Sequence, residues 1–226
     1  MNELKDILKI FYINYHDDKT DWYHWVVKDI YLPKGIELTN ESKVKRNLQL
    51  KEKLHSMWIQ SNEETKGNLI EFYIVKWGGI KTNRTDSLNI YKTNSASDLI
   101  NRGKRGVSSW SKALVVHDCN KYAIFDARVS SSLNILQILA KNENKVLFPI
   151  LSSRNNIIIK GNLKIKEISM NESWSKLSNN NFYTEYINLL KIVAEELNTN
   201  ISTIEMLLFA KAEELVTELI NLNKLK

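Results

Sequence analysis

Apolar residues recur at helical spacing in several parts of the chain. In residues 3–16 they lie three or four positions apart, as on one face of a helix, and comprise Leu4, Ile7, Leu8, Phe11, Tyr12 and Tyr15. The same period runs through residues 182–197 and 202–223, and the second of these opens with a capping-box pattern, Ser202 to Glu205. The sequence therefore predicts helices over these three segments.

The remaining pattern is more varied. Residues 39–60 begin with polar residues and continue as a charged amphipathic helix, whose predicted inner surface includes Leu48, Leu50, Leu54 and Trp58. Residues 131–142 also keep a helical period. Residues 146–165 are rich in β-branched side chains between turn signals, which predicts extended structure. The aromatic-rich residues 21–35 fit a strand or a helix equally well.

Two glycine-containing segments punctuate the middle of the chain. Residues 68–80 read as a buried segment that stops at Gly78 and Gly79, where a double glycine permits a tight turn. Residues 93–112, "TNSASDLINRGKRGVSSWSK", predict a short helix, a glycine and basic connector, and a second helix, which together form a helix-hairpin-helix candidate. Because the chain has only two prolines and seven glycines, long helices meet few breakers, and we expect a mainly α fold with a small extended or β element.

The length of 226 residues allows one large domain with a substantial core. We expect a single domain over 1–226 with two lobes, one formed by 1–99 together with 160–226 and the other by 100–159. Lys and Arg number 32 against 26 Asp and Glu, a net charge of +6, which makes a polyanion a plausible partner.

Cysteine content and hydropathy restrict the class of protein. Cys119 is the one cysteine, so an internal disulfide framework and every multi-cysteine metal centre are excluded. No stretch approaches the roughly 18 apolar residues needed to span a bilayer, and the N-terminal residues do not resemble a signal peptide. We therefore expect a cytoplasmic protein with no membrane partner.

Two short stretches carry a resemblance to a known family. "GVSSWSK" places Gly106 and Val107 ahead of Lys112, and "IFDARV" places Asp126 at the head of the next predicted helix. This arrangement resembles the helix-hairpin-helix DNA glycosylases, most closely the 8-oxoguanine DNA glycosylase type. Near the C-terminus "EMLLFAKAEEL" is similar to the helix that supplies base-pocket residues in that type, with matching positions Glu205 and Phe209. The hairpin lacks the usual second glycine, which marks a divergent branch.

The resemblance implies a two-lobed glycosylase fold and a bifunctional glycosylase/lyase that excises a damaged or modified base, with 8-oxoguanine favoured. Lys112 would be the nucleophile that forms a Schiff base, and Asp126 would stabilise the positive charge that develops on the sugar. Glu205 would accept hydrogen bonds from a guanine, and Phe209 would stack on the extruded base. No metal or organic cofactor is implied.

The implied partner is double-stranded DNA that carries a modified base, bound by a monomer associated with the nucleoid. The expected backbone contacts come from the hairpin amides and nearby basic side chains, namely Lys104, Arg105, Gly106, Val107, Ser108, Ser109 and Arg128. Arg128 fits a pair with a carboxylate equally well.

Several of these residues also fit ordinary structural roles. On spacing alone Lys112 fits a solvated helix lysine, and Asp126 fits an N-cap of a helix starting at Ala127. Glu205 fits the capping box, and Phe209 fits a helix core.

Other functional residues and functions stay open. Trp77 fits either a pocket aromatic or core packing, and His117 with Cys119 lacks the further ligands of a zinc site. Arg154 and Asn155 are expected in a loop, where polar groups are accessible to DNA. The alternative functions are a non-catalytic DNA-binding module and a glycosylase that acts on modified bases of foreign DNA.

Overall fold

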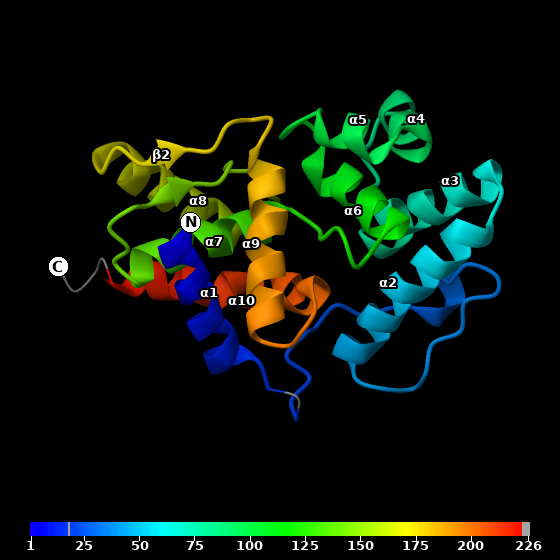
Figure 1. Ribbon diagram of the computed structural model, residues 1–226, viewed down its shortest axis with the longest axis horizontal. Coiled ribbons are helices and arrows are strands. Elements are labelled where there is room, and N and C mark those ends of the chain that lie inside the picture. Colours follow the sequence, from blue (N-terminus) through cyan, green and yellow to red (C-terminus); the bar gives the residue numbers. More distant parts are fainter. Residues whose placement is uncertain (18, 223–226) are drawn as a thin grey trace. The chain divides into compact units, whose positions relative to one another are not determined.

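The computed structural model describes residues 1–17 and 19–222, and this part of the chain is mainly helical with a small two-stranded parallel sheet (Figure 1). The predicted mainly α class with a small β element is therefore confirmed. The chain divides into two compact units, which we describe separately: unit 1 is Met1–His16 with Phe125–Lys226, and unit 2 is Asp17–Ile124. These bounds differ from the lobes expected from the sequence, because the first helix packs with the C-terminal half and the hairpin packs with the helices that precede it.

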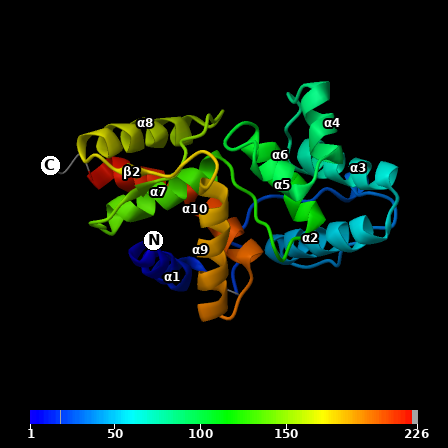
Figure 2. The same cartoon turned by 45° about the horizontal axis from the view of Figure 1, so that its top comes forward.

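Unit 2 is built around α6. Its elements in chain order are η1 (Asp29–Tyr31), α2 (Lys43–Gln60), α3 (Glu63–Glu71), the π-helical turn η2 (Phe72–Trp77), α4 (Thr85–Thr93), α5 (Ala96–Ile100) and α6 (Val107–His117). Helix α6 contacts α2, α3, η2, α4 and α5, and Figure 2 shows it among these helices. It buries Val107, Trp110 and Leu114 completely or nearly so, which makes it the core helix of the unit.

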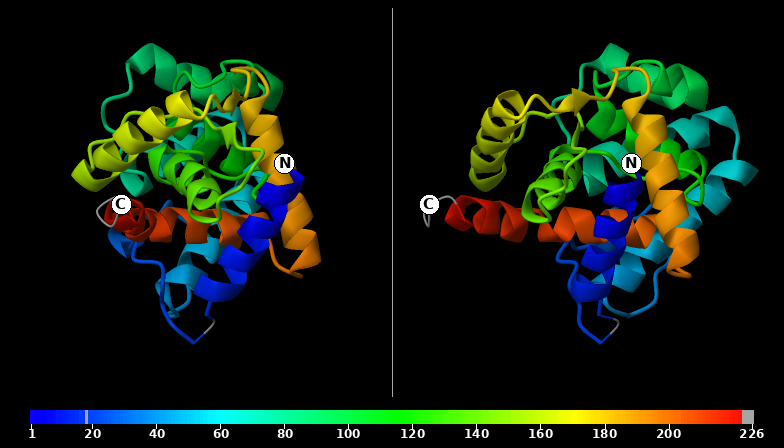
Figure 3. Two further views of the ribbon diagram at one scale, coloured as in Figure 1. Left: turned by 90° about the vertical axis from the view of Figure 1, so that its left-hand side faces the viewer. Right: turned by 60° about the vertical axis from the view of Figure 1, so that its left-hand side comes forward.

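Unit 1 is built around α10. Its elements are α1 (Asn2–Tyr15), α7 (Ala127–Leu139), β1 (Val146–Leu147), α8 (Asn156–Asn171), β2 (Ser175–Lys176), α9 (Phe182–Glu196) and α10 (Ile201–Leu222). Helix α10 contacts α7, α8, α9 and α1, and α1 also lies beside α9, as Figure 3 shows in blue and orange. The aromatic rings of Phe125, Phe148, Phe182 and Tyr186 meet in the core beside α7.

Polar side chains fix α7 in the interior of unit 1. Asn134 exchanges hydrogen bonds with the main chain of Phe148, at 3.2 and 3.0 Å, and Gln137 does the same with Val146, at 2.9 and 2.8 Å. Ser132 Oγ donates to the carbonyl of Leu208 in α10, at 2.7 Å. Because buried polar groups must be satisfied, these bonds align α7 with the 146–148 segment and with α10. They therefore fix the helix that begins next to Asp126.

The predicted helices over 3–16, 39–60, 131–142, 182–197 and 202–223 are confirmed, with shifted ends, as α1, α2, α7, α9 and α10; residue 223 lies outside the described residues. The short helix, connector and second helix expected over 93–112 are present as α5, residues 101–106 and α6.

The extended structure expected over 146–165 is wrong for most of that segment. Only Val146–Leu147 forms a strand, and α8 begins at Asn156. Asn155 accepts hydrogen bonds from the amides of Ile157 and Ile158, at 2.9 and 3.1 Å, so it caps α8. The isoleucines at 157–159 are typical of a strand, but in α8 only Ile158 of the three is buried, on the same face as Ile165 two turns later.

The capping box expected from Ser202 to Glu205 is also wrong. Helix α10 begins at Ile201, and Asn200 accepts the amide of Thr203 at 2.8 Å, so Ser202 lies inside the first turn. The undecided segment 21–35 contains neither a strand nor an α-helix, only the short turn η1.

Candidate functional site

The helical hairpin between α5 and α6 depends on two glycines in the left-handed region. Gly103 and Gly106 have φ values of 59° and 73°, which cost a glycine little and other residues more. A Cβ at Gly106 would overlap the hydroxyl oxygen of Tyr91, so this position also lacks room for a side chain. Trp110 Nε1 donates to the carbonyl of Gly103 at 3.2 Å and ties the hairpin to α6. The connector between α5 and α6 therefore contains two glycines with a positive φ, three residues apart.

The hairpin exposes a helix N-terminus beside two cations. Gly106 is the N-cap residue of α6, and no side chain in the described part of the chain caps the first turn. Lys104, Arg105 and Gly106 are exposed, and Ser108 is half-buried. The helix dipole and the charges of Lys104 and Arg105 favour an anion here.

Two of the hairpin residues predicted to contact DNA have side chains that face the protein. Val107 is buried in the core, and Ser109 Oγ donates to Asn83 Oδ1 at 3.1 Å. Their main-chain amides already donate within the hairpin, Val107 to the Lys104 carbonyl at 3.4 Å and Ser109 to the Gly106 carbonyl at 2.9 Å. A phosphate would have to share or displace these bonds.

Lys112 is buried rather than solvated. Its side chain has only 5% exposure, and Nζ donates to the carbonyl of Ser108, one turn earlier, at 2.7 Å. The aliphatic part of the side chain lies against Gly78, where a Cβ would come within 2.8 and 3.0 Å of Lys112 Cε and Cδ. Gly78 at the end of η2 therefore makes room for this lysine. Sequence reasoning found Lys112 and Gly78 separately, but it missed that one accommodates the other.

Asp126 is the N-cap of α7, which confirms the structural role predicted for it. Oδ1 accepts from the amides of Arg128 and Val129, at 2.9 and 3.1 Å. Both bonds use the same oxygen, so the cap does not engage Oδ2. The carboxylate can therefore cap the helix and still offer an oxygen to another group.

Arg128 pairs with a carboxylate in unit 1. Its Nη2 bonds Glu213 Oε1 at 2.5 Å, and its guanidinium lies 5.1 Å from the ring centre of Phe209. Asn155 Nδ2 donates to the same Glu213 oxygen at 3.0 Å. Arg128 and Phe209 thus belong to one cluster near the start of α7, and the half-buried Phe209 ring is covered by a cation on one face.

Glu205 lies deep in unit 1, with 1% exposure, one turn before Phe209 on α10. The neighbouring Tyr186 was not found from the sequence. Burial, together with the negative charges of Glu205 and Asp126, raises the pKa of Tyr186 well above its usual value. Both carboxylates therefore act on one buried phenol, which keeps its proton and stays a hydrogen-bond donor at neutral pH. The only sequence signal was an aromatic at a core position of a helix.

The predicted residues are distributed over the two units. Lys112 and the hairpin belong to unit 2, whereas Asp126, Arg128, Glu205 and Phe209 belong to unit 1. Within unit 1 the structure brings Arg128 together with Phe209, and it places Asp126 and Glu205 within electrostatic reach of Tyr186.

The other titratable candidates pack in unit 2. His117 stacks on Trp58 with ring centres 4.6 Å apart, and burial beside Lys66 and His55 lowers its pKa to about 4. Burial raises the pKa of the Cys119 thiol to about 11. No group of three or more metal-ligating side chains occurs among the described residues.

Among the described residues, no helix has both the length and the apolar character that crossing a bilayer requires. No protein-family model matches the chain, and no curated protein or solved structure is significantly similar to it.

Proposed function

We propose that the chain is a DNA N-glycosylase with lyase activity that excises an extruded damaged or modified base, most readily 8-oxoguanine, from double-stranded DNA. The observation that supports this most directly is the buried Lys112 on the helix behind an exposed hairpin. An amine removed from water is one of the forms in which proteins use lysine as a nucleophile. A lysine on the protein surface would not need the space that the missing Cβ of Gly78 provides.

The chemistry assigns a separate task to each residue. The Lys112 amine, once it has lost its proton, attacks C1′ of the target nucleotide while the C1′–N bond to the base breaks, and the base leaves with a proton. Opening of the sugar ring gives a Schiff base, from which loss of a C2′ proton breaks the C3′–O bond of the strand. Asp126 Oδ2, which the helix cap does not use, would stabilise positive charge on the sugar.

The other residues would bind the DNA and the base. The exposed start of α6, with Lys104 and Arg105 beside it, has the helix dipole and the charge to attract a phosphate. Glu205 and Phe209, one turn apart on α10, would accept hydrogen bonds from the base and stack on it. Because Phe209 carries Arg128 in this structure, a base that stacks on that face must displace the guanidinium.

The direct test is covalent trapping. Duplexes that each carry one modified base are incubated with the protein and borohydride, which reduces a Schiff base to a stable adduct. We expect an adduct with at least one lesion, and no adduct with Lys112→Gln, whereas Lys53→Gln, an exposed lysine on α2, should behave as the parent protein. A Lys112→Met variant keeps the apolar part of the side chain, and circular dichroism reports whether each variant is folded. Absence of an adduct and of base release with every lesion would refute the proposal.

Asp126→Asn separates the two roles of the aspartate. Asparagine caps helices about as well as aspartate does, so the free energy of unfolding should change by less than about 1 kcal/mol. The carboxylate charge is lost, so base release should fall by about 100-fold or more. Unchanged base release in a folded Asp126→Asn protein would leave Asp126 as a cap only.

In Glu205→Gln, we expect an altered ratio of activities between 8-oxoguanine and other lesions.

One observation favours a non-catalytic DNA-binding protein as the second candidate. The hydrogen bond from Lys112 Nζ to the Ser108 carbonyl is a structural use of the amine, which would steady the hairpin without any chemistry. Duplex binding without base release, weakened by changes at the hairpin, would favour this function.

A further inference from the structure

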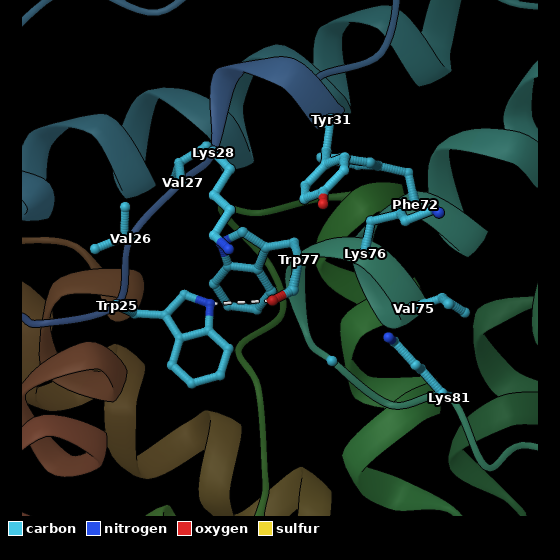
Figure 4. Close-up of a pocket in the computed structure, with 11 residues that line it drawn as sticks. Trp25, Val26, Val27, Lys28, Tyr31, Phe72, Val75, Lys76, Trp77 and Lys81 are labelled. Atoms are coloured by element: carbon cyan, nitrogen blue, oxygen red, sulfur yellow. Dashed lines mark hydrogen bonds between the residues drawn. The ribbon is translucent and has the colours of Figure 1, made fainter.

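A pocket of about 330 Å³ in unit 2 combines aromatic rings with lysines, as the close-up in Figure 4 shows. Its principal side chains are Trp25, Lys28, Tyr31, Lys76, Trp77 and Lys81, accompanied by valines and a phenylalanine. They come from the segment that leads into η1 and from η2 with the loop after it. The volume falls within the roughly 300 to 1,000 Å³ that is usual for small-ligand pockets.

The aromatic wall of this pocket is held rigidly. Trp25 Nε1 donates to the carbonyl of Trp77 at 3.1 Å, and Trp77 Nε1 donates to Asn47 Oδ1 at 2.9 Å. Asn47 Nδ2 donates in turn to the carbonyl of Trp25 at 2.8 Å, and this asparagine is 1% exposed. Trp77 also stacks on Tyr73 with ring centres 4.3 Å apart. The two indoles are therefore preorganised on a buried polar support, which lowers the cost of ordering them when a ligand binds.

The charge of the pocket has one sign. Lys28, Lys76 and Lys81 line it, and none of the residues around it, all within the described range 19–222, is acidic. Lys76 Nζ lies 5.8 Å from the ring centre of Tyr31, which is 47% exposed. Three lysines in a lining without an acidic side chain favour an anionic ligand, and an exposed ring beside two fixed indoles favours a flat aromatic one.

We infer that this pocket binds an unpaired nucleotide of a DNA strand, with the base stacked on the exposed ring of Tyr31 beside the indoles of Trp25 and Trp77, and the adjacent phosphates near the lysines. Aromatic faces joined to a basic surface are the chemistry by which proteins hold single-stranded nucleic acid. A base inside a duplex has both faces covered by stacking, so only an unpaired one can use these rings. The inference takes DNA as the partner from the proposed function, but it requires neither Lys112 nor any chemical step.

Fluorescence anisotropy of labelled eight-nucleotide strands tests the inference. We expect the intact protein to bind oligothymidylate at least about fivefold more tightly than an abasic strand of the same length and charge, since stacking needs a base. Tyr31→Ala removes an exposed ring that forms no hydrogen bond in the wall, and it should abolish most of this preference. Equal affinity for the two strands, or an unchanged preference in Tyr31→Ala, would refute the inference.

The lysines are tested by salt dependence. Lys28→Gln with Lys81→Gln should weaken oligothymidylate binding and reduce the slope of log K against log salt by roughly 1.4, because each single-strand phosphate contact contributes about 0.7. The matched control, Lys53→Gln with Lys121→Gln, removes two exposed lysines of unit 2 that do not line the pocket. An equal loss in both double variants would refute a specific role of Lys28 and Lys81 in the pocket. Tighter binding of an oligoglutamate peptide than of the DNA strand would refute a nucleotide as the ligand.

The two proposals fail separately. Lys112→Gln should lose the borohydride adduct but keep the preference for oligothymidylate over the abasic strand. If no lesion yields an adduct and the strand preference persists, the glycosylase proposal is wrong and the pocket inference stands. If adducts form but the strand preference is absent, the pocket inference is wrong and the glycosylase proposal stands.

Discussion

Gly106 satisfies two constraints at a single residue, a φ of 73° and contact with Tyr91. Gly106→Ala should lower the free energy of unfolding by about 2 to 4 kcal/mol, of which about 1 comes from the left-handed backbone and the rest from the overlap with the phenol. Urea unfolding followed by circular dichroism measures the loss.

Gly79 is the matched control for this prediction. It has a φ of 66°, but a Cβ there would have nothing within 4 Å, so Gly79→Ala should lose only the backbone part, about 1 kcal/mol. Tyr91→Phe removes the oxygen and leaves ring carbon Cζ at 3.2 Å as the nearest atom, so it should recover part of the loss in Gly106→Ala. Equal losses in the two glycine variants would show that Tyr91 imposes no constraint.

At this scale the sequence indicates candidate residues but not their surroundings. Lys112 and Asp126 are candidates because of their positions, behind a hairpin and at the head of a helix. The burial of Lys112 was not, since it depends on Gly78, which is distant in sequence and meets it only in the fold. Tyr186 carried no signal for the same reason, because its pKa is set by carboxylates on other elements of unit 1.

At the scale of elements, the packing of α8 on α10 passes through Gly161. A Cβ there would lie 2.5 Å from Val216 Cγ2 and 3.0 Å from Cγ1, and Val216 is fully buried. Gly161→Ala should therefore destabilise unit 1 by about 1 to 2 kcal/mol, although alanine normally gains about 1 kcal/mol over glycine inside a helix. Adding Val216→Ala removes the clashing methyl groups, so the two losses should be less than additive by at least about 1 kcal/mol.

Gly67 in α3 provides the comparison for that prediction. Its Cβ would meet Lys92 Cε at 2.9 Å, and the end of a lysine side chain can move at little cost. Gly67→Ala should therefore be neutral or stabilising in the same urea measurement. Strict additivity of Gly161→Ala and Val216→Ala, or a loss in Gly67→Ala as large as that in Gly161→Ala, would contradict this account.

The elements that the sequence predicted well are the long ones with an uninterrupted apolar period, such as α9 and α10. Helix α8 was missed because its isoleucine run satisfies strand propensity, while the deciding features are the Asn155 cap and the packing of Gly161 on Val216. Propensity is a weak guide where tertiary contacts decide. The segment 21–35 could not be assigned because its aromatic residues serve a pocket and a hydrogen-bond network rather than a regular element.

At the scale of the whole molecule, the positive charge is unevenly divided between the two units. Unit 2 holds 18 of the 32 Lys and Arg and 13 of the 26 Asp and Glu, a net charge of +5, whereas unit 1 has +1. The hairpin and the aromatic pocket both lie in unit 2. If the partner is DNA, unit 2 should therefore supply most of the electrostatic part of binding.

This division can be measured with two double variants that remove the same charge. Lys104→Gln with Arg105→Gln takes two exposed cations from the hairpin, and Lys160→Gln with Lys166→Gln takes two exposed lysines from α8 in unit 1. For a duplex of fixed sequence, the hairpin variant should reduce the slope of log K against log salt by roughly 1.8, since each phosphate contact contributes about 0.9. The α8 variant should leave the slope unchanged. Because both variants lower the net charge equally, a similar reduction in the two would mean that overall charge, and not the hairpin, governs binding to DNA.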